Sequence, residues 1–319
     1  MIWLTWRQHR GQILTTAGFL LALGALLLVS GLQGYRISES LRNCSDSAGD
    51  LCTVFVTEID GLYQGVYQVY GWMPLLIPAL IGAFWGAPLL AREFERGTDQ
   101  LVWTQSVPPK RWIVVKLAVL GGLVTLGGLA LSAMASAWRV AFDAVLGESW
   151  FGNIGVFNMV GVAPPAWWLF AFALGTASGA LLRKVLPAMA VTAAGVALTM
   201  FGLFSLSDFY AEPVRKVVAE RRDAFVQDIR LVGVTWVAPS GEETADPPLR
   251  VCQVGPDVRP DGERYVQEQC LFENGYRLAV YHHPPSRFWR FQWTEAGILL
   301  VGSALLFGLT VARTVRRTR

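Results

Sequence analysis

Long apolar runs, each almost free of charge, decide what this 319-residue chain can fold into. A run of about 20 apolar residues matches the roughly 30 Å hydrocarbon core of a lipid bilayer. Inside that core every backbone polar group needs an internal partner, so a spanning segment of this length is an α-helix. We therefore predict six spanning helices, at residues 13–32, 71–91, 112–137, 160–182, 185–206 and 296–311.

The composition agrees with this fold class. Hydrophobic residues make up 53% of the chain and charged residues 16%, whereas a typical soluble domain is about 25% charged. The charges gather between the apolar runs. The predicted fold is an α-helical polytopic membrane protein, with helices 1–5 in residues 13–206 and helix 6 with a basic tail in residues 293–319.

The N-terminal residues 1–12 combine Trp3 and Trp6 with Arg7 and Arg10. Tryptophan is enriched at membrane interfaces, and arginine is retained on the cytoplasmic side. We predict a short interfacial helix here; the alternative is a disordered terminus with a few basic residues. The following connection, residues 33–70, is polar and acidic and is predicted to be a loop.

The longest polar region, residues 207–292, is predicted to be a small α+β extracellular domain. After Pro213, apolar residues recur at helical spacing at positions 214, 217, 218, 225 and 229, which predicts a helix. Shorter strand-like pieces follow, separated by proline and by Asn274–Gly275.

Charge asymmetry predicts the orientation. Basic residues predominate at the N-terminus, in residues 92–116, at Arg183–Lys184 and in the tail, whereas the other side is acidic in balance. Lysine and arginine in short loops stay on the cytoplasmic side. Both termini are therefore predicted to lie on the cytoplasmic side of the cell membrane.

All four cysteines then lie on the external side, where an oxidising environment permits disulfides. We predict the pairs Cys44–Cys52 and Cys252–Cys270. Free thiols and the crossed pairings remain alternatives, since sequence alone does not fix connectivity.

Several kinds of chemistry have no motif in this sequence. None of the four lysines follows a glycine, so there is no phosphate-cradling Gly-Lys motif. The sequence contains neither His-Glu-x-x-His nor Gly-x-Ser-x-Gly. No predicted span has a charge at its centre, which argues against a proton- or sodium-coupled transporter. An intramembrane enzyme is disfavoured as well. If the chain moves a substrate, the energy comes from elsewhere.

Two further features of the sequence concern helix packing and contact with a partner. The second and fourth spans contain Gly-xxx-Gly patterns, Gly82/Gly86 and Gly175/Gly179, which permit close helix approach but are weak signals in a glycine-rich chain. Between the second and third spans, Glu93, Glu95 and Asp99 are the only acids on the basic side. They indicate either a docking surface for a partner or, equally, the first turn of a solvated helix.

The segment around these acids is ALLAREFERGTDQLVWTQSVPPKRWIVVKL, and it resembles the ABC-2 type permeases of actinobacterial type, the membrane halves of ATP-binding-cassette exporters. The residues that match in order are Arg92, Glu93, Glu95, Gly97, Thr98 and Lys116. The resemblance implies that residues 92–111 contain a coupling helix, in which the first five of these residues contact an ATPase.

The resemblance further implies two ABC ATPase subunits, which bind ATP and Mg, and a homodimer or heterodimer of permeases in membrane lipid. This chain itself would bind no cofactor, no metal and no nucleic acid, and would be non-catalytic. The expected function is export of an amphipathic drug, lipid or peptide-like substrate. The large region 207–292 departs from the short connection that the family usually has there. The alternative is a membrane sensor whose external domain binds a ligand and whose cytoplasmic loop contacts a regulator.

Overall fold

A computed structural model describes residues 2–42, 44, 49–97, 108–146, 151–219, 229–245, 252 and 268–316. The chain forms two compact units. The helical unit comprises Met1–Gly147, Ile154–Leu206 and Arg290–Arg319, and the strand unit comprises Glu148–Asn153 and Ser207–Trp289.

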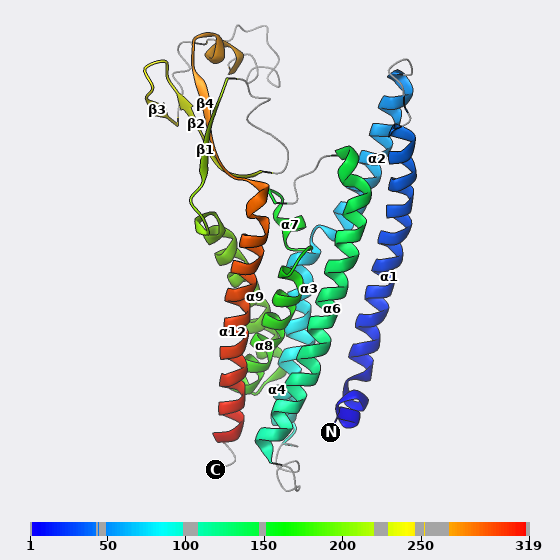
Figure 1. Cartoon of the computed structure of the whole chain (residues 1–319). Helices are drawn as coiled ribbons and strands as arrows, with labels where there is room; N and C mark the ends of the chain where they lie inside the picture. Colours follow the sequence, from blue (N-terminus) through cyan, green and yellow to red (C-terminus); the bar gives the residue numbers. More distant parts are fainter. Residues whose placement is uncertain are drawn as a thin grey trace. The chain divides into compact units, whose positions relative to one another are not determined.

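The helical unit is built from long helices that run alongside one another (Figure 1). In chain order they are α1 (Ile2–Arg42), α2 (Gly49–Tyr70), α3 (Met73–Ile81), the π-helix η2 (Gly82–Gly86), α4 (Ala87–Glu95), α6 (Pro109–Leu146), α7 (Ile154–Phe157), α8 (Ala163–Leu182), α9 (Val185–Leu206) and α12 (Phe288–Arg316).

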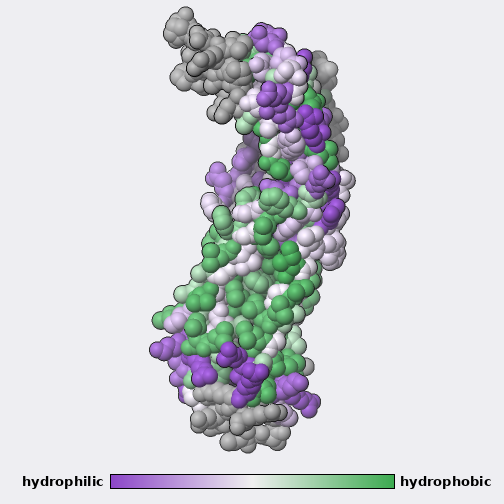
Figure 2. Space-filling model, turned by 90° about the vertical axis from the view of Figure 1, so that its left-hand side faces the viewer, coloured by the Kyte–Doolittle hydropathy of each residue, from purple (hydrophilic) through white to green (hydrophobic). Residues whose placement is uncertain are grey.

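Within the described residues, six helical stretches are long and apolar enough to cross a membrane: Trp6–Leu41, Cys52–Glu95, Lys110–Val140, Ala163–Leu182, Val185–Tyr210 and Pro285–Arg316. Figure 2 shows one face of these helices, where hydrophobic residues form a broad band above a hydrophilic lower rim. The chain is therefore a polytopic helical membrane protein.

The first helices are longer than the apolar runs predict. α1 is one helix through the boundary expected at residue 12, and α2 occupies much of the connection expected as a loop in residues 33–70. The reason is visible in α2, where Ile59, Tyr63 and Val66 recur at helical spacing and are buried. Tyr63 stacks on Trp138 of α6, with ring centroids 5.4 Å apart.

Glycine allows the backbones at the centre of this unit to meet. A Cβ atom added at Gly175 of α8 would lie 2.2 Å from the Gly82 carbonyl oxygen, and one at Gly179 would lie 2.4 Å from that of Ala87. The two Gly-xxx-Gly patterns thus face each other. Farther along α6, a Cβ atom at Gly128 would lie 2.6 Å from Cα of Pro165. The α3–η2–α4 segment and α6 therefore both contact α8 at backbone distance.

The strand unit is a four-stranded antiparallel sheet in the order β1–β4–β2–β3. The strands are β1 (Val214–Val218), β2 (Arg230–Val237), β3 (Glu243–Thr244) and β4 (Arg277–His283), and residues 268–273 are helical. Val218, Leu278 and Val280 form a small core. Phe272 covers it, with its ring centroid 5.4 Å from that of Trp236.

The prediction of a helix after Pro213 is wrong for its first residues. Residues 214–218 form β1, which pairs with β4 in register from Val214↔His282 to Val218↔Leu278. The segment VRKVV is rich in β-branched valine, which favours a pleated strand. That preference prevails over the helical spacing. The middle of the expected helix, residues 220–228, lies outside the described residues, and its last position, Ile229, is not helical and directly precedes β2.

Both predicted disulfides are present in the structure. Cys44 and Cys52 have Cα atoms 6.0 Å apart and connect the chain before α2 to the first turn of α2. Cys252 and Cys270 have Cα atoms 5.9 Å apart and connect residue 252 to the helical residues 268–273. Each disulfide therefore fastens an element within one unit.

Candidate coupling site at the end of α4

Three residues of the predicted coupling motif, Arg92, Glu93 and Glu95, lie in the last turn of α4. The helix ends at Glu95, the Arg96 amide donates to the Arg92 carbonyl oxygen at 3.2 Å, and Gly97 has φ +66°. A left-handed residue just after a helix satisfies its final carbonyls, and glycine adopts that conformation without strain. Gly97 therefore ends the helix.

The predicted coupling helix, residues 92–111, is described only at its two ends. Its first part is the last turn of α4, and its final part is the start of α6 at Pro109. Thr98 and Asp99 belong to residues 98–107, which lie outside the described residues. The coupling role of these residues stays a prediction.

An ion pair joins the two helices that flank residues 98–107. The Lys116 ammonium lies 2.6 Å from Glu93 Oε1, and the two side chains are 5% and 21% exposed, respectively. Lys116 Nζ also lies 4.3 Å from the ring centroid of Trp112, a cation–π distance. Burial weakens solvent screening, so the attraction between these two charges is less screened than in a surface salt bridge. α4 and α6 are thereby fixed to each other close to the loop.

The positions of Glu93 and Glu95 bear on one of the two interpretations left open by the sequence, whereas the docking role stays a prediction and Asp99 lies outside the described residues. Glu93 and Glu95 lie in the last turn of α4, so the helix-start interpretation is wrong for both. A carboxylate at a helix C-terminus is unfavourable by about 0.3–1 kcal/mol, because the helix dipole is negative there. Glu93 is compensated by Lys116, whereas Glu95 is exposed. Glu95 is accordingly the better candidate for contact with a partner.

α1 also reaches this region through a residue that the sequence analysis did not select. Gln12 donates from Nε2 to the Phe84 carbonyl oxygen at 2.7 Å, and its Oε1 accepts a hydrogen bond from His9 Nδ1 at 2.7 Å. Phe84 lies in η2, and π-helices frequently occur at functional sites. In the sequence, Gln12 is only a polar residue just before an apolar run. Nothing in that pattern predicts a hydrogen bond to a residue 72 positions away.

The α3–η2–α4 segment is held on its other side by α8 and α9. Ala87 and Ala91 of α4 are completely buried and pack with Ala188 of α9. Together with Gly179 of α8, these small residues allow close helix contact. A displacement of α4 would therefore move against α8 and α9 without an intervening layer of flexible side chains.

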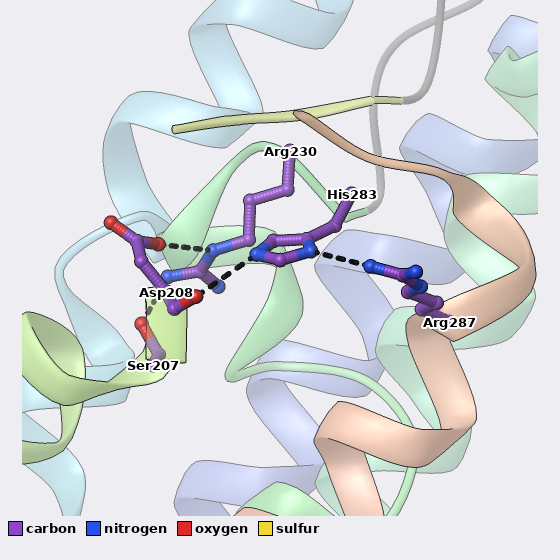
Figure 3. Close-up of polar contacts among 5 residues, drawn as sticks. All are labelled: Ser207, Asp208, Arg230, His283 and Arg287. Carbon is purple, nitrogen blue, oxygen red and sulfur yellow. Dashed lines mark hydrogen bonds and ion pairs between the residues drawn. The ribbon is translucent and has the colours of Figure 1, made fainter. Parts of the chain in front are cut away.

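A second polar cluster lies in the strand unit, and Figure 3 shows its members. Arg230 is 6% exposed, lies 3.2 Å from Asp208 Oδ1, and donates to the Ser207 hydroxyl. His283 is fully buried and donates from Nε2 to the Asp208 carbonyl oxygen at 3.1 Å. Its Nδ1 accepts a hydrogen bond from Arg287 Nη1 at 3.0 Å.

These bonds fix His283 as the neutral imidazole. One ring nitrogen donates to a carbonyl and the other accepts from a guanidinium, so protonation would break the second bond. Burial, reinforced by the charge of Arg287 and opposed by the Asp208 bond, lowers the pKa of His283. Arg287 donates also to the Glu212 carbonyl oxygen. The cluster joins the beginning and the end of the strand unit and has a structural role.

No group of three or more His, Cys, Asp or Glu side chains that could hold a metal occurs in the part of the chain that the structure describes. The six long apolar helical stretches define a polytopic helical membrane protein.

The chain belongs to the ABC-2 membrane transporter related family, whose model matches residues 17–206. This range runs from within α1 to the end of α9 and includes the predicted coupling helix, residues 92–111. The comparisons with curated proteins and with solved structures found no match. The family favours a permease-type transporter over the sensor alternative.

Proposed function

We propose that this chain is the non-catalytic permease subunit of an ATP-binding-cassette exporter, driven by a separate ATPase that binds ATP and Mg. The assembly contains two ATPase subunits and a dimer of permeases, either homodimeric or heterodimeric, and the substrate is an amphipathic drug, lipid or peptide. Family membership supports an ABC transporter with an ATPase partner.

The orientation in this proposal follows from charge. Arg7 and Arg10 lie near the start of α1, Arg183 and Lys184 lie between α8 and α9, and Arg313 and Arg316 lie in the last turn of α12. The positive-inside tendency assigns these helix ends to the cytoplasm. The strand unit and both disulfides then lie outside the cell, where disulfides persist.

The observation that carries the proposal is the ion pair between Glu93 and Lys116 beside the loop. A partner that displaces residues 98–107 moves α4 and α6 together because the pair joins them. α4 packs without a gap on α8 and α9. A movement at the loop therefore reaches four helices of the unit, which is what coupling to an ATPase requires.

The ATPase partner is tested by purifying the tagged full-length chain in mild detergent and identifying bound proteins by mass spectrometry. We expect a stoichiometric ATPase. The Glu95→Lys variant should lose it, because the charge change is exposed and leaves the Glu93–Lys116 pair intact. Reversing Glu93 as well is a poorer test, since it would place a second cation against the buried Lys116 ammonium.

The control is Glu58→Lys, the same charge reversal at an exposed position of α2. It should keep the ATPase. If the monodisperse wild-type chain brings down no ATPase, the exporter proposal is wrong and a sensor becomes the better hypothesis. If both variants lose the ATPase equally, Glu95 has no specific role.

A further inference from the structure

A groove of about 530 Å³ lies between α1 and the α3–η2–α4 segment, with contributions from α8 and α9. Most of its lining is apolar, and it includes Phe19, Ile77, Leu80, Phe84, Trp85 and Met189. Along the α3–η2–α4 segment the lining runs from Ile77 to Arg92, which corresponds to about 22 Å of helix. One leaflet's hydrocarbon is roughly 15 Å thick. The groove is therefore long enough for an acyl chain.

The groove also has a polar side. Gln12, Thr15 and Thr16 of α1 line it in succession, although they lie in a membrane-spanning helix. The Thr15 hydroxyl shares its proton between two backbone carbonyl oxygens of α1, at 3.0 Å to Gly11 and 2.9 Å to Gln12, so its oxygen can still accept a hydrogen bond. An amphipathic ligand matches such a lining better than a purely apolar one.

One end of the groove is positively charged. Arg92 lines this end and is exposed. The neighbouring Glu93 carboxylate is engaged by the Lys116 ammonium, so the two charges offset each other. Among the residues that the structure describes, Arg92 makes no ion pair, so its guanidinium at the mouth is available to an anion. Guanidinium groups bind phosphate oxygens in a bidentate manner.

We propose that this groove binds an anionic phospholipid of the inner leaflet, with the phosphate at Arg92 and an acyl chain along Phe84 and Leu80. The inference rests on the cytoplasmic orientation of the α4 end in the proposed function, but it needs no ATPase. Basic pockets between helices on the cytoplasmic side are suited to anionic headgroups. A neutral phospholipid has the same chains but carries a cationic group beside its phosphate, so it gains less from Arg92.

The position of η2 gives the bound lipid a route to the coupling site. Phe84 and Trp85 belong to η2 and line the groove, and Gln12 holds the Phe84 carbonyl oxygen. η2 continues directly into α4, whose last turn carries Arg92 and Glu93. A lipid bound in the groove would therefore contact the segment that continues into α4, the helix that the ATPase is proposed to move.

The test uses the full-length chain, purified alone in mild detergent and titrated with phosphatidylglycerol or phosphatidylcholine, with retained lipid counted by native mass spectrometry. We expect the wild type to prefer phosphatidylglycerol by about tenfold, the effect of one charge-assisted contact. Arg92→Gln should abolish the preference and Arg92→Lys should retain most of it. Thr16→Trp, which fills the groove, should reduce binding of both lipids.

The matched control is Arg96→Gln, an exposed arginine one turn farther along that does not line the groove. It should bind as the wild type does. Equal retention of the two lipids by the wild type, or equal loss of preference in the Arg92 and Arg96 glutamine variants, would overturn the proposal. Because no ATPase is present, either result is independent of the partner-binding experiment above.

Discussion

The two units of this chain are stabilised in different ways. In the helical unit, glycine brings backbones together, as where Gly175 meets Gly82. In the strand unit, side chains and a disulfide connect distant parts, as where Arg230 pairs with Asp208 and Cys252 is bonded to Cys270. A bilayer provides little hydrophobic driving force between helices, so close packing is the main attraction there. A small unit in water has too little core and gains from cross-links.

The largest effect is expected from Gly175→Val, which introduces a Cβ 2.2 Å from a backbone oxygen that cannot move cheaply. Overpacking of this kind should destabilise the helical unit by about 3 kcal/mol or more, measured as the midpoint of denaturant unfolding in detergent. The control is Gly122→Ala in α6, where an added Cβ meets nothing within 4 Å. A Gly175 variant as stable as that control would refute backbone packing at this site.

The second effect concerns the strand unit. Replacing Cys252 and Cys270 with serine opens a cross-link over 18 residues, which should cost about 3 kcal/mol locally. Hydrogen exchange should become faster in β2 and β4 and remain unchanged in α8. Replacing Cys44 and Cys52 is the matched comparison, because that disulfide belongs to the helical unit. If α8 loosened as much as β4, the two units would not be independent.

A smaller effect is expected at the ion pair. Glu93→Gln leaves the Lys116 charge almost fully buried without a counter-charge, although the amide oxygen can still accept a hydrogen bond. We expect a loss of about 2 kcal/mol in unfolding free energy. Adding Lys116→Met should restore much of it, because the charge is then gone. A double variant that is less stable than Glu93→Gln would contradict this account.

The smallest effect depends on pH. Because the pKa of His283 is lowered from 6.5 in the folded chain, the neutral form contributes stability fully above pH 6.5. As the pH falls below 6.5, the unfolded chain takes up a proton first and the strand unit loses stability. Hydrogen exchange in β4 should therefore accelerate in mild acid. His283→Gln preserves a donor and an acceptor without a titrating group and should remove this dependence.

The membrane class could be predicted from the sequence because each span is a long apolar run, and the family match agrees with the predicted resemblance to ABC-2 type permeases. Two predictions failed. The segment of α2 was expected to be a loop because charged residues interrupt its apolar ones, and the segment of β1 was expected to be a helix because its β-branched valines happen to recur at helical spacing. The Glu93–Lys116 pairing and the Gln12–Phe84 bond join residues 23 and 72 positions apart. Local patterns do not encode such distances, because they depend on how helices pack.

The contact between Gly128 and Pro165 has a mechanical consequence for α6. This helix runs from Pro109 to Leu146 and is about 57 Å long, with Gly128 close to its midpoint. A pivot at this contact would divide α6 into two arms of nearly equal length. Tilting it by roughly 5° would swing each end by about 2.5 Å, in opposite directions. Such a pivot would turn a push at Lys116 into a displacement of Leu146 that is opposite in direction and somewhat larger, because Leu146 lies farther from Gly128.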